Sequence, residues 1–161
     1  MSISIDKIDE LISMMTLDEK VGQLNQHLYG WQCFCKNKDG DYELTQLFND
    51  HVQKFGGVGA IYGILRADAW SGMNEVNGVK KEESLQVIEM IQNYLKTETR
   101  LKIPALITEE CVHGHQGLHS MMYPANISMG MTWNPDLLKE ICQEVSCELA
   151  SKGGNLALFT G

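Results

Sequence analysis

The chain has 161 residues, of which 43% are hydrophobic and 21% charged, and its formal net charge is −8. This length suits a single domain with a substantial core, and the composition is that of a globular protein rather than of a disordered chain. The excess of acidic over basic residues, 21 against 13, argues against a nucleic-acid partner, because binding to phosphate backbones requires a concentrated positive surface. No segment approaches the roughly 20 apolar residues of a membrane span, so we expect no membrane partner.

The cysteines and the start of the chain bear on its location. The five cysteines are an odd number, which favours free thiols in a reducing compartment. Residues 1–6 have neither the basic segment nor the long apolar segment of a signal peptide. The sequence therefore predicts a cytoplasmic protein.

Residues 1–57 are predicted to form a helical lead-in. Apolar residues at helical spacing predict helices at 5–15, 16–28 and 43–55, with a loop at 30–42. Thr16 and Glu19 have the spacing of a capping box, which separates the first helix from the second. Gly56 and Gly57 are expected to end the third helix.

Residues 58–161 are predicted to alternate between buried strands and amphipathic helices. Short apolar segments predict strands at 58–64, 104–108 and 155–159, and helical stripes predict helices at 82–95 and 134–152. Alternation of this kind implies parallel strands joined by right-handed crossovers. The fold class is therefore α/β, in either a small open sheet or a (β/α)8 barrel.

The length of the chain separates these two architectures. A complete (β/α)8 barrel needs about 250 residues. Three strands and two crossover helices would then be the first three βα repeats of an incomplete barrel, forming one structural unit with the lead-in. Polar residues follow the carboxyl ends of the strands, where both architectures place their sites.

The segment 107–119 is the richest in chemically active side chains, with two carboxylates and three imidazoles. Its simplest interpretation is a hydrogen-bonded polar loop. A second is a metal-binding loop, in which His113, His115 and His119, with Glu110 or Cys111, would supply zinc ligands. The spacing is not a strict metal signature, so we predict no metal site and keep this alternative open. No Gly-x-Gly-x-x-Gly motif opens a helix, and we expect no cofactor.

A third interpretation is carbohydrate recognition. A carboxylate at a strand end can accept charge-assisted hydrogen bonds from sugar hydroxyls. The planar side chains of Trp70, Tyr123 or Trp133 could pack on the apolar face of a pyranose ring. Composition alone does not favour this interpretation over the metal site.

A set of motifs favours the carbohydrate interpretation. An Ile-Pro strand leads to Glu110-Cys-Val-His-Gly114, and then come Tyr123-Pro124 and Thr132-Trp-Asn-Pro135. This succession is similar to glycoside hydrolase family 3. Further segments resemble the same family in order along the chain, at residues 8–25, 59–63, 65–70 and 154–158.

The resemblance implies the N-terminal part of a (β/α)8 barrel from a retaining, exo-acting β-glycosidase. Such enzymes use two carboxylates about 5 Å apart, a nucleophile and an acid/base. In the family both come later than any position in this chain. We therefore predict no catalytic residue here and no activity for the chain alone, with a carbohydrate and the remainder of the barrel as partners. The alternative is a non-catalytic sugar-binding or partner-dependent remnant.

Three residues are predicted to bind substrate. The resemblance assigns Glu110 to the family's sugar-binding acid and His113 to its histidine, which also suits a structural role. Arg66 resembles part of the first loop, where an ion pair with Asp68 is the alternative. Glu109 is either a buried, paired group or a ligand. Because adjacent residues of a strand face opposite sides, Glu109 and Glu110 are not predicted to be a catalytic pair.

Overall fold

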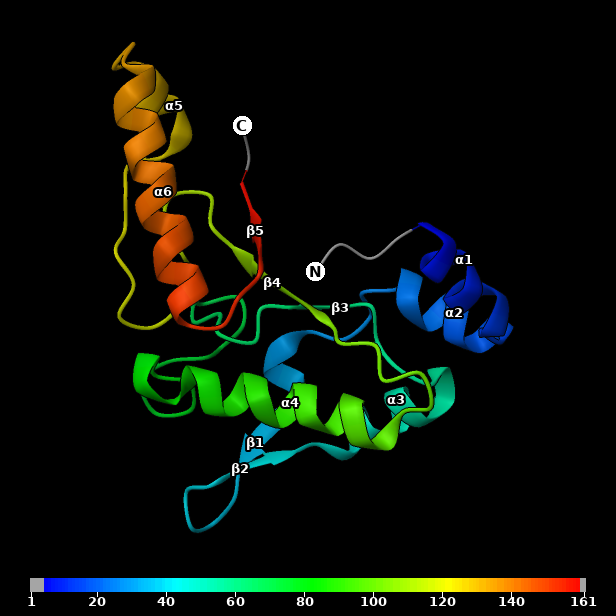
Figure 1. Ribbon diagram of the computed structural model, residues 1–161. Helices are drawn as coiled ribbons and strands as arrows, with labels where there is room; N and C mark the ends of the chain where they lie inside the picture. Colours follow the sequence, from blue (N-terminus) through cyan, green and yellow to red (C-terminus); the bar gives the residue numbers. More distant parts are fainter. Residues whose placement is uncertain (1–4, 160–161) are drawn as a thin grey trace.

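The computed structural model describes residues 5–159 (Figure 1). Residues 1–4 lie outside the described part, so the prediction that residues 1–6 are not a signal peptide falls largely outside it. The helices are α1 (Ile5–Met14), α2 (Leu17–Leu24), α3 (Gln46–Phe55), α4 (Ser84–Glu98), α5 (Asn126–Gly130) and α6 (Pro135–Ser151). The strands are β1 (Phe34–Lys36), β2 (Tyr42–Leu44), β3 (Ala60–Tyr62), β4 (Leu106–Glu110) and β5 (Leu156–Leu158).

A parallel sheet in the order β3-β4-β5 forms the centre of the fold. Tyr62 lies opposite Thr108, and Glu110 lies opposite Leu158. This confirms the three parallel strands predicted from alternation. β4 begins two residues later than expected and extends to Glu110, so both of its acidic residues belong to the strand rather than to the loop that follows.

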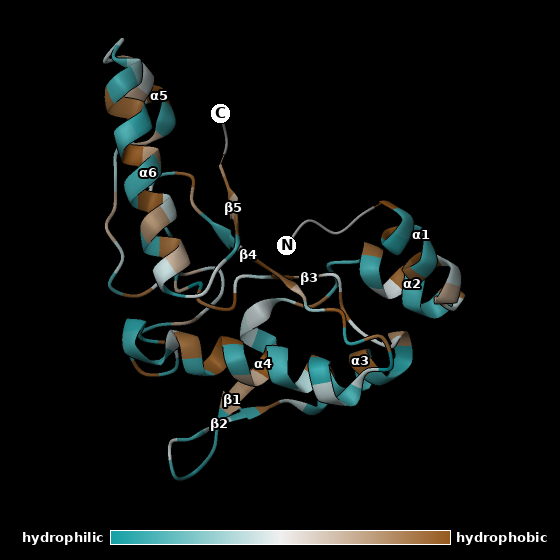
Figure 2. Cartoon of the chain, in the orientation of Figure 1, coloured by the Kyte–Doolittle hydropathy of each residue, from teal (hydrophilic) through white to brown (hydrophobic). Residues whose placement is uncertain are grey.

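The two crossover helices lie on different parts of the sheet (Figure 1). α4 buries Val87, Ile91 and Leu95 in the larger hydrophobic core, together with residues of β3 and β4. α6 packs through Val145 and Leu149 in a smaller cluster. Figure 2 shows the hydrophobic residues of β4 at the centre of the arrangement, between these helices.

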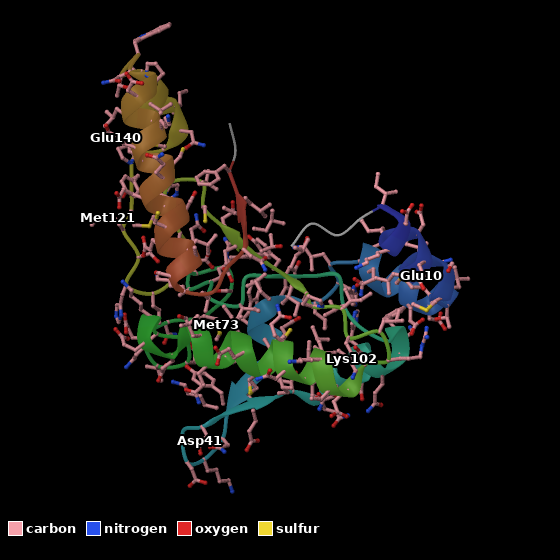
Figure 3. All side chains as sticks on the ribbon, in the orientation of Figure 1. Glu10, Asp41, Met73, Lys102, Met121 and Glu140 are labelled. Carbon is pink, nitrogen blue, oxygen red and sulfur yellow. The ribbon has the colours of Figure 1, made fainter. Side chains whose placement is uncertain are left out.

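A β-hairpin replaces part of the loop predicted at 30–42. β1 and β2 pair antiparallel, with Phe34 opposite Leu44, and Phe34 and Tyr42 are buried. Asn37 closes the turn, because its side-chain oxygen accepts from the backbone N–H groups of Asp39 and Asp41. Asp41 lies at the outer end of this hairpin (Figure 3). The prediction of a loop was wrong for residues 34–36 and 42, because the Asn-x-Asp-Gly segment at 37–40 forms a turn that lets the two flanking segments pair.

The helices of the lead-in begin at side-chain caps. Thr16 forms the expected capping box with Glu19 at the start of α2. The helix predicted at 43–55 begins only at Gln46, because residues 42–44 are paired in the hairpin and Thr45 caps the helix. Gly56, at φ 64°, ends α3 as predicted.

The lead-in shares the larger core with the βα repeats. Leu28, Phe34 and Phe48 from before residue 57 pack in the same cluster as Ile61 and Ile107. The division at residue 57 stays a prediction about domain organisation. Within residues 5–159, no helix combines the length and apolar character that crossing a bilayer requires.

Candidate functional site

The carboxyl ends of β3 and β4 bring a tyrosine and a carboxylate together. Tyr62 lies opposite Thr108 in the register, and Glu110 lies two residues beyond Thr108 on the same face of the strand. The Tyr62 hydroxyl accordingly donates to Glu110 Oε2 at 2.7 Å. Burial, followed by this hydrogen bond and the Glu110 charge, raises the pKa of Tyr62 to about 12. The phenol therefore stays protonated as a donor at neutral pH.

Arg66 joins this pair from the loop after β3. Its guanidinium also contacts the Tyr62 hydroxyl, and its Nη1 atom lies 3.6 Å from Glu110 Oε2. Its Nε atom donates to Asp68 Oδ2 at 2.7 Å. Burial tends to raise the pKa of Asp68, but hydrogen bonds from Arg66 and Ser71 outweigh it and hold that pKa below its ordinary value. Arg66 thus forms the ion pair with Asp68 and also reaches Glu110.

A cluster of aromatic rings lies on one side of Arg66, which the Trp70 and Tyr62 rings contact. The ring of Trp70 lies 4.7 Å from Arg66 Cζ, and the Trp70 side chain is 58% exposed. Tyr29 stacks on Trp31 with ring centroids 4.7 Å apart, and both rings stand edge-on to Trp70. Of these aromatic residues, only Trp70 was predicted from the sequence to pack on a pyranose ring.

The segment after α2 enters the site because its backbone lies against β3. Tyr29 forms a parallel bridge with Tyr62. A Cβ atom at Gly30 would lie 2.2 Å from the backbone nitrogen of Ile64, so the close approach requires glycine at this position. The signal that could have identified this segment is the Tyr-Gly-Trp sequence at 29–31, where a glycine separates two aromatic residues.

The other two aromatic candidates lie elsewhere. Trp133 is 92% exposed between α5 and α6, and Tyr123 packs against the cluster of Cys111, Val145 and Leu149. Burial raises the pKa of Cys111 to about 12, so its thiol stays protonated. We therefore place the aromatic side of the site at residues 29–31 and Trp70.

His113 lies beside the Arg66 loop, and no described contact joins it to Glu110. It lines a cavity of about 350 Å³ whose other lining residues are Ala67, Asp68, Gln116, Gly117 and Met122. Its carbonyl oxygen accepts from the Tyr123 N–H at 2.8 Å, which ties the loop after β4 together. The structure thus brings Glu110 and Arg66 together and places His113 beside Asp68, at a cavity whose lining includes neither Glu110 nor Arg66.

Glu109 points away from Glu110 and is completely buried. Its Oε1 atom accepts from the Leu65 N–H at 2.9 Å, and its Oε2 atom faces His115 Nε2 at 3.5 Å. Of the two interpretations from sequence, the buried and paired group is therefore the one observed.

The three histidines of the metal-binding alternative separate in the structure. His115 is buried beside Glu109, whereas His119 lies on the surface at 3.1 Å from Glu75. His113 lines the cavity next to Asp68. Across residues 5–159, no three His, Cys, Asp or Glu side chains are arranged to hold a metal ion. The described structure gives this alternative no support.

The chemistry available at the strand ends is hydrogen bonding to a polar, uncharged ligand. An ionised carboxylate offers about four acceptor positions, of which the Tyr62 hydroxyl uses one. Glu110 remains 20% exposed and can accept further hydroxyl donors. Trp70 offers an exposed aromatic surface next to it, on which an apolar sugar face can pack.

Parallel strands with crossover helices, and polar groups gathered at the strand ends, are what the first part of a (β/α)8 barrel would show. Comparison with known families then gives the specific assignment. Residues 16–158 match the family described as "Glycosyl hydrolase family 3 N terminal domain". The chain belongs to this family, which confirms the resemblance seen in its motifs.

A curated relative gives a measure of how much of such a protein the chain represents. The chain is similar to the "Periplasmic beta-glucosidase" of Salmonella typhimurium, with 25% identity over 149 residues. The match covers 92% of this chain and 15% of the relative. The chain therefore spans a small part of the length of this relative.

Proposed function

We propose that the chain forms the first part of the barrel of a retaining, exo-acting β-glycosidase, in which it binds a sugar through Glu110, Arg66 and His113. The nucleophile and the acid/base would come from further repeats, so the chain alone would not hydrolyse glycosides. Family membership and the name of the Salmonella relative support this proposal.

The observation that carries the proposal is the contact among Tyr62, Arg66 and Glu110 at the ends of two adjacent strands. Arg66 and Tyr62 hold the Glu110 carboxylate from one side, through Oε2. Its remaining acceptor positions can bind two hydroxyls of one pyranose. These hydrogen bonds would be charge-assisted, which is the stronger kind. Trp70 supplies the apolar wall that a sugar site requires.

Calorimetric titration of the 161-residue chain with glucose or cellobiose tests the sugar site. We expect binding heat in the native chain and a roughly tenfold weaker affinity in Glu110→Gln, which keeps the shape of the side chain but removes its charge. Glu144→Gln is the matched control, because Glu144 is exposed on α6. Equal heats in the native chain and Glu110→Gln would contradict the proposal.

The missing chemistry has a separate test. Purified chain should release no nitrophenolate from an aryl β-glucoside above the buffer background. Release that is lost in Glu110→Gln but retained in Glu144→Gln would show that this chain carries its own catalytic groups. It would contradict the proposal that the nucleophile and the acid/base come from further repeats.

A second candidate is a remnant that folds fully only with a partner. It is favoured by the apolar side chains of Leu156, Leu158 and Phe159, which are 39–42% exposed on and after β5. Sugar binding without hydrolysis, even when the remaining repeats are supplied as a separate chain, would support it over the glycosidase.

We also propose a cytoplasmic location. It is supported by five free cysteines, of which Cys33 and Cys111 are buried. The word "Periplasmic" belongs to the name of the Salmonella relative. Fractionation of cells that express the chain tests the location, and recovery with periplasmic proteins would contradict it.

A further inference from the structure

A chain of buried polar side chains lies behind the candidate site. Lys152, at the end of α6, is only 2% exposed. Its Nζ atom donates to Ser120 Oγ at 2.6 Å and to Glu148 Oε1 at 2.8 Å, and it lies 3.4 Å from His115 Nδ1. An ammonium group has only donors, so it favours an unprotonated, accepting Nδ1 on His115.

His115 and Glu109 continue this chain to the sheet. Both side chains have no exposed surface. With Nδ1 accepting, an N–H on His115 lies at Nε2, which faces Glu109 Oε2 at 3.5 Å. This contact is electrostatic, because neither atom makes a hydrogen bond within the described residues. The other Glu109 oxygen accepts from the Leu65 N–H. The network of Lys152, His115 and Glu109 therefore connects α6, the loop after β4, β4 itself and the loop after β3.

The end of this network at the sheet lies next in sequence to two proposed sugar-binding residues. Glu109 precedes Glu110, and Leu65, which Glu109 holds, precedes Arg66. His115 follows His113 by two positions. Because adjacent strand residues face opposite sides, the buried network can fix the backbone of these residues without occupying the ligand side.

We propose that Glu109, His115 and Lys152 are positioning residues, which hold the backbones that carry Glu110, Arg66 and His113 in the geometry for binding a sugar. The inference rests on the proposed sugar site. A buried charged network is a poor source of net stability, because removing charges from water offsets much of their attraction. Its physical value is orientation, since binding groups need support from a second layer of hydrogen bonds to stay in place.

The Leu65 amide provides a direct measurement, because its hydrogen bond goes to a side chain of the network. The neighbouring Gly63 amide donates to the Thr108 carbonyl, in the backbone ladder. In Lys152→Met we expect hydrogen exchange at Leu65 to become roughly tenfold faster, with exchange at Gly63 unchanged. Lys36→Met is the matched control, because Lys36 pairs with Glu83 outside the network. It should change neither amide.

Two outcomes of the exchange experiment would overturn the proposal. Equal acceleration at Leu65 and Gly63 would show that Lys152 only stabilises the fold as a whole. No acceleration at either amide would show that Glu109 is held without Lys152. If Lys152→Met does not fold, Ser120→Ala removes one acceptor of Lys152 and the 3.2 Å contact with His115 Nδ1, while Lys152 keeps Glu148, and it should give a smaller effect confined to Leu65.

Cellobiose affinity connects the network to function. In Lys152→Met the dissociation constant should rise several-fold while Glu110 and Arg66 are still present, and in Lys36→Met it should not. Faster exchange at Leu65 with unchanged affinity would overturn the positioning role. If the native chain binds no sugar, the proposed function fails, whereas Leu65 exchange still decides whether the network anchors this backbone.

Discussion

Arg66 is held by a hydrogen bond to the Tyr62 hydroxyl, ion pairs with the Asp68 and Glu110 carboxylates and a cation–π contact with the Trp70 ring. Burial tends to lower the pKa of its guanidinium, but the hydrogen bond to Asp68 and the charges around it outweigh this effect and raise it. The cation is therefore permanent, and it balances two carboxylates that would otherwise repel each other.

Removing the Arg66 cation should change the titration of Asp68. In Arg66→Met, we expect the pKa of Asp68 to rise towards its ordinary value, because burial and the Ser71 hydrogen bonds remain while the hydrogen bond and charge of Arg66 are lost. Carboxyl carbon NMR across acidic pH measures this change. Arg100→Met removes an arginine that pairs with Glu19, so it should leave Asp68 unaffected.

Glu19 is expected to make the chain less stable as the pH falls through the acidic range. Hydrogen bonds from Arg100 and from the Thr16 backbone lower the pKa of Glu19 to about 2, from an ordinary value of 4.5. The ionised carboxylate therefore stabilises the fold above pH 4.5, and this contribution is lost as the pH falls towards 2. In Glu19→Gln, the free energy of unfolding should be lower at neutral pH and should fall less over this interval. Urea denaturation at both ends of the interval measures this difference. An equal loss of unfolding free energy in the native chain and in Glu19→Gln would contradict this expectation.

Much of the site could be predicted at the residue scale, but not all of it. Glu110 was found because a carboxylate at a strand end is a recognisable pattern with a family match. Tyr62 was missed because its role depends on the register between β3 and β4, which brings its hydroxyl diagonally across to Glu110. Single-sequence periodicity contains no information on register between strands that are 46 residues apart.

At the element scale, apolar periodicity predicted α1 to α4 and α6, and short apolar segments predicted the three parallel strands, whereas α5 and the short hairpin were missed. The helix predicted at 16–28 ends at Leu24. β1 and β2 have three residues each, too few for alternation to be distinguished from chance. The approach of the Tyr29 segment to β3 was also unpredictable, because it depends on long-range packing of the backbone.

Gly30 offers a test of that close approach. Gly30→Ala should lower the free energy of unfolding by about 2 kcal/mol and displace Trp31, because the added methyl group would overlap the Ile64 backbone. Urea denaturation followed by tryptophan fluorescence measures both effects. Gly130→Ala is the matched control, because a Cβ atom there meets nothing within 4 Å. Equal stabilities of the two variants would contradict the packing described for residues 29–31.

At the scale of the whole molecule, the outer edge of β5 is apolar and pairs with no other described strand. Among residues 5–159, β5 pairs with β4 alone, and Leu156 and Leu158 are each 39% exposed. The outer part of α6 extends beyond the sheet (Figure 1), and its buried residues, Val145 and Leu149, lie in its second half. A strand with an apolar, unpaired edge of this kind tends to join other strands.

We expect the isolated chain to self-associate through β5. Light scattering or sedimentation should show association that increases with concentration, and Leu158→Lys should reduce it by placing a charge on the edge strand. Leu47→Lys is the matched control, because Leu47 is 51% exposed on α3, outside the sheet. Equal suppression by both variants would mean that added charge, rather than the strand, governs association.

The bridge between Tyr29 and Tyr62 makes the two edges of the sheet different. Tyr29 lies at the flank of β3 opposite β4, so a strand arriving there has to fit beside the lead-in, whereas β5 offers its whole outer flank. A cylinder built on this sheet would therefore grow outward from β5. Its seam would lie at β3, beside the aromatic rings of residues 29–31.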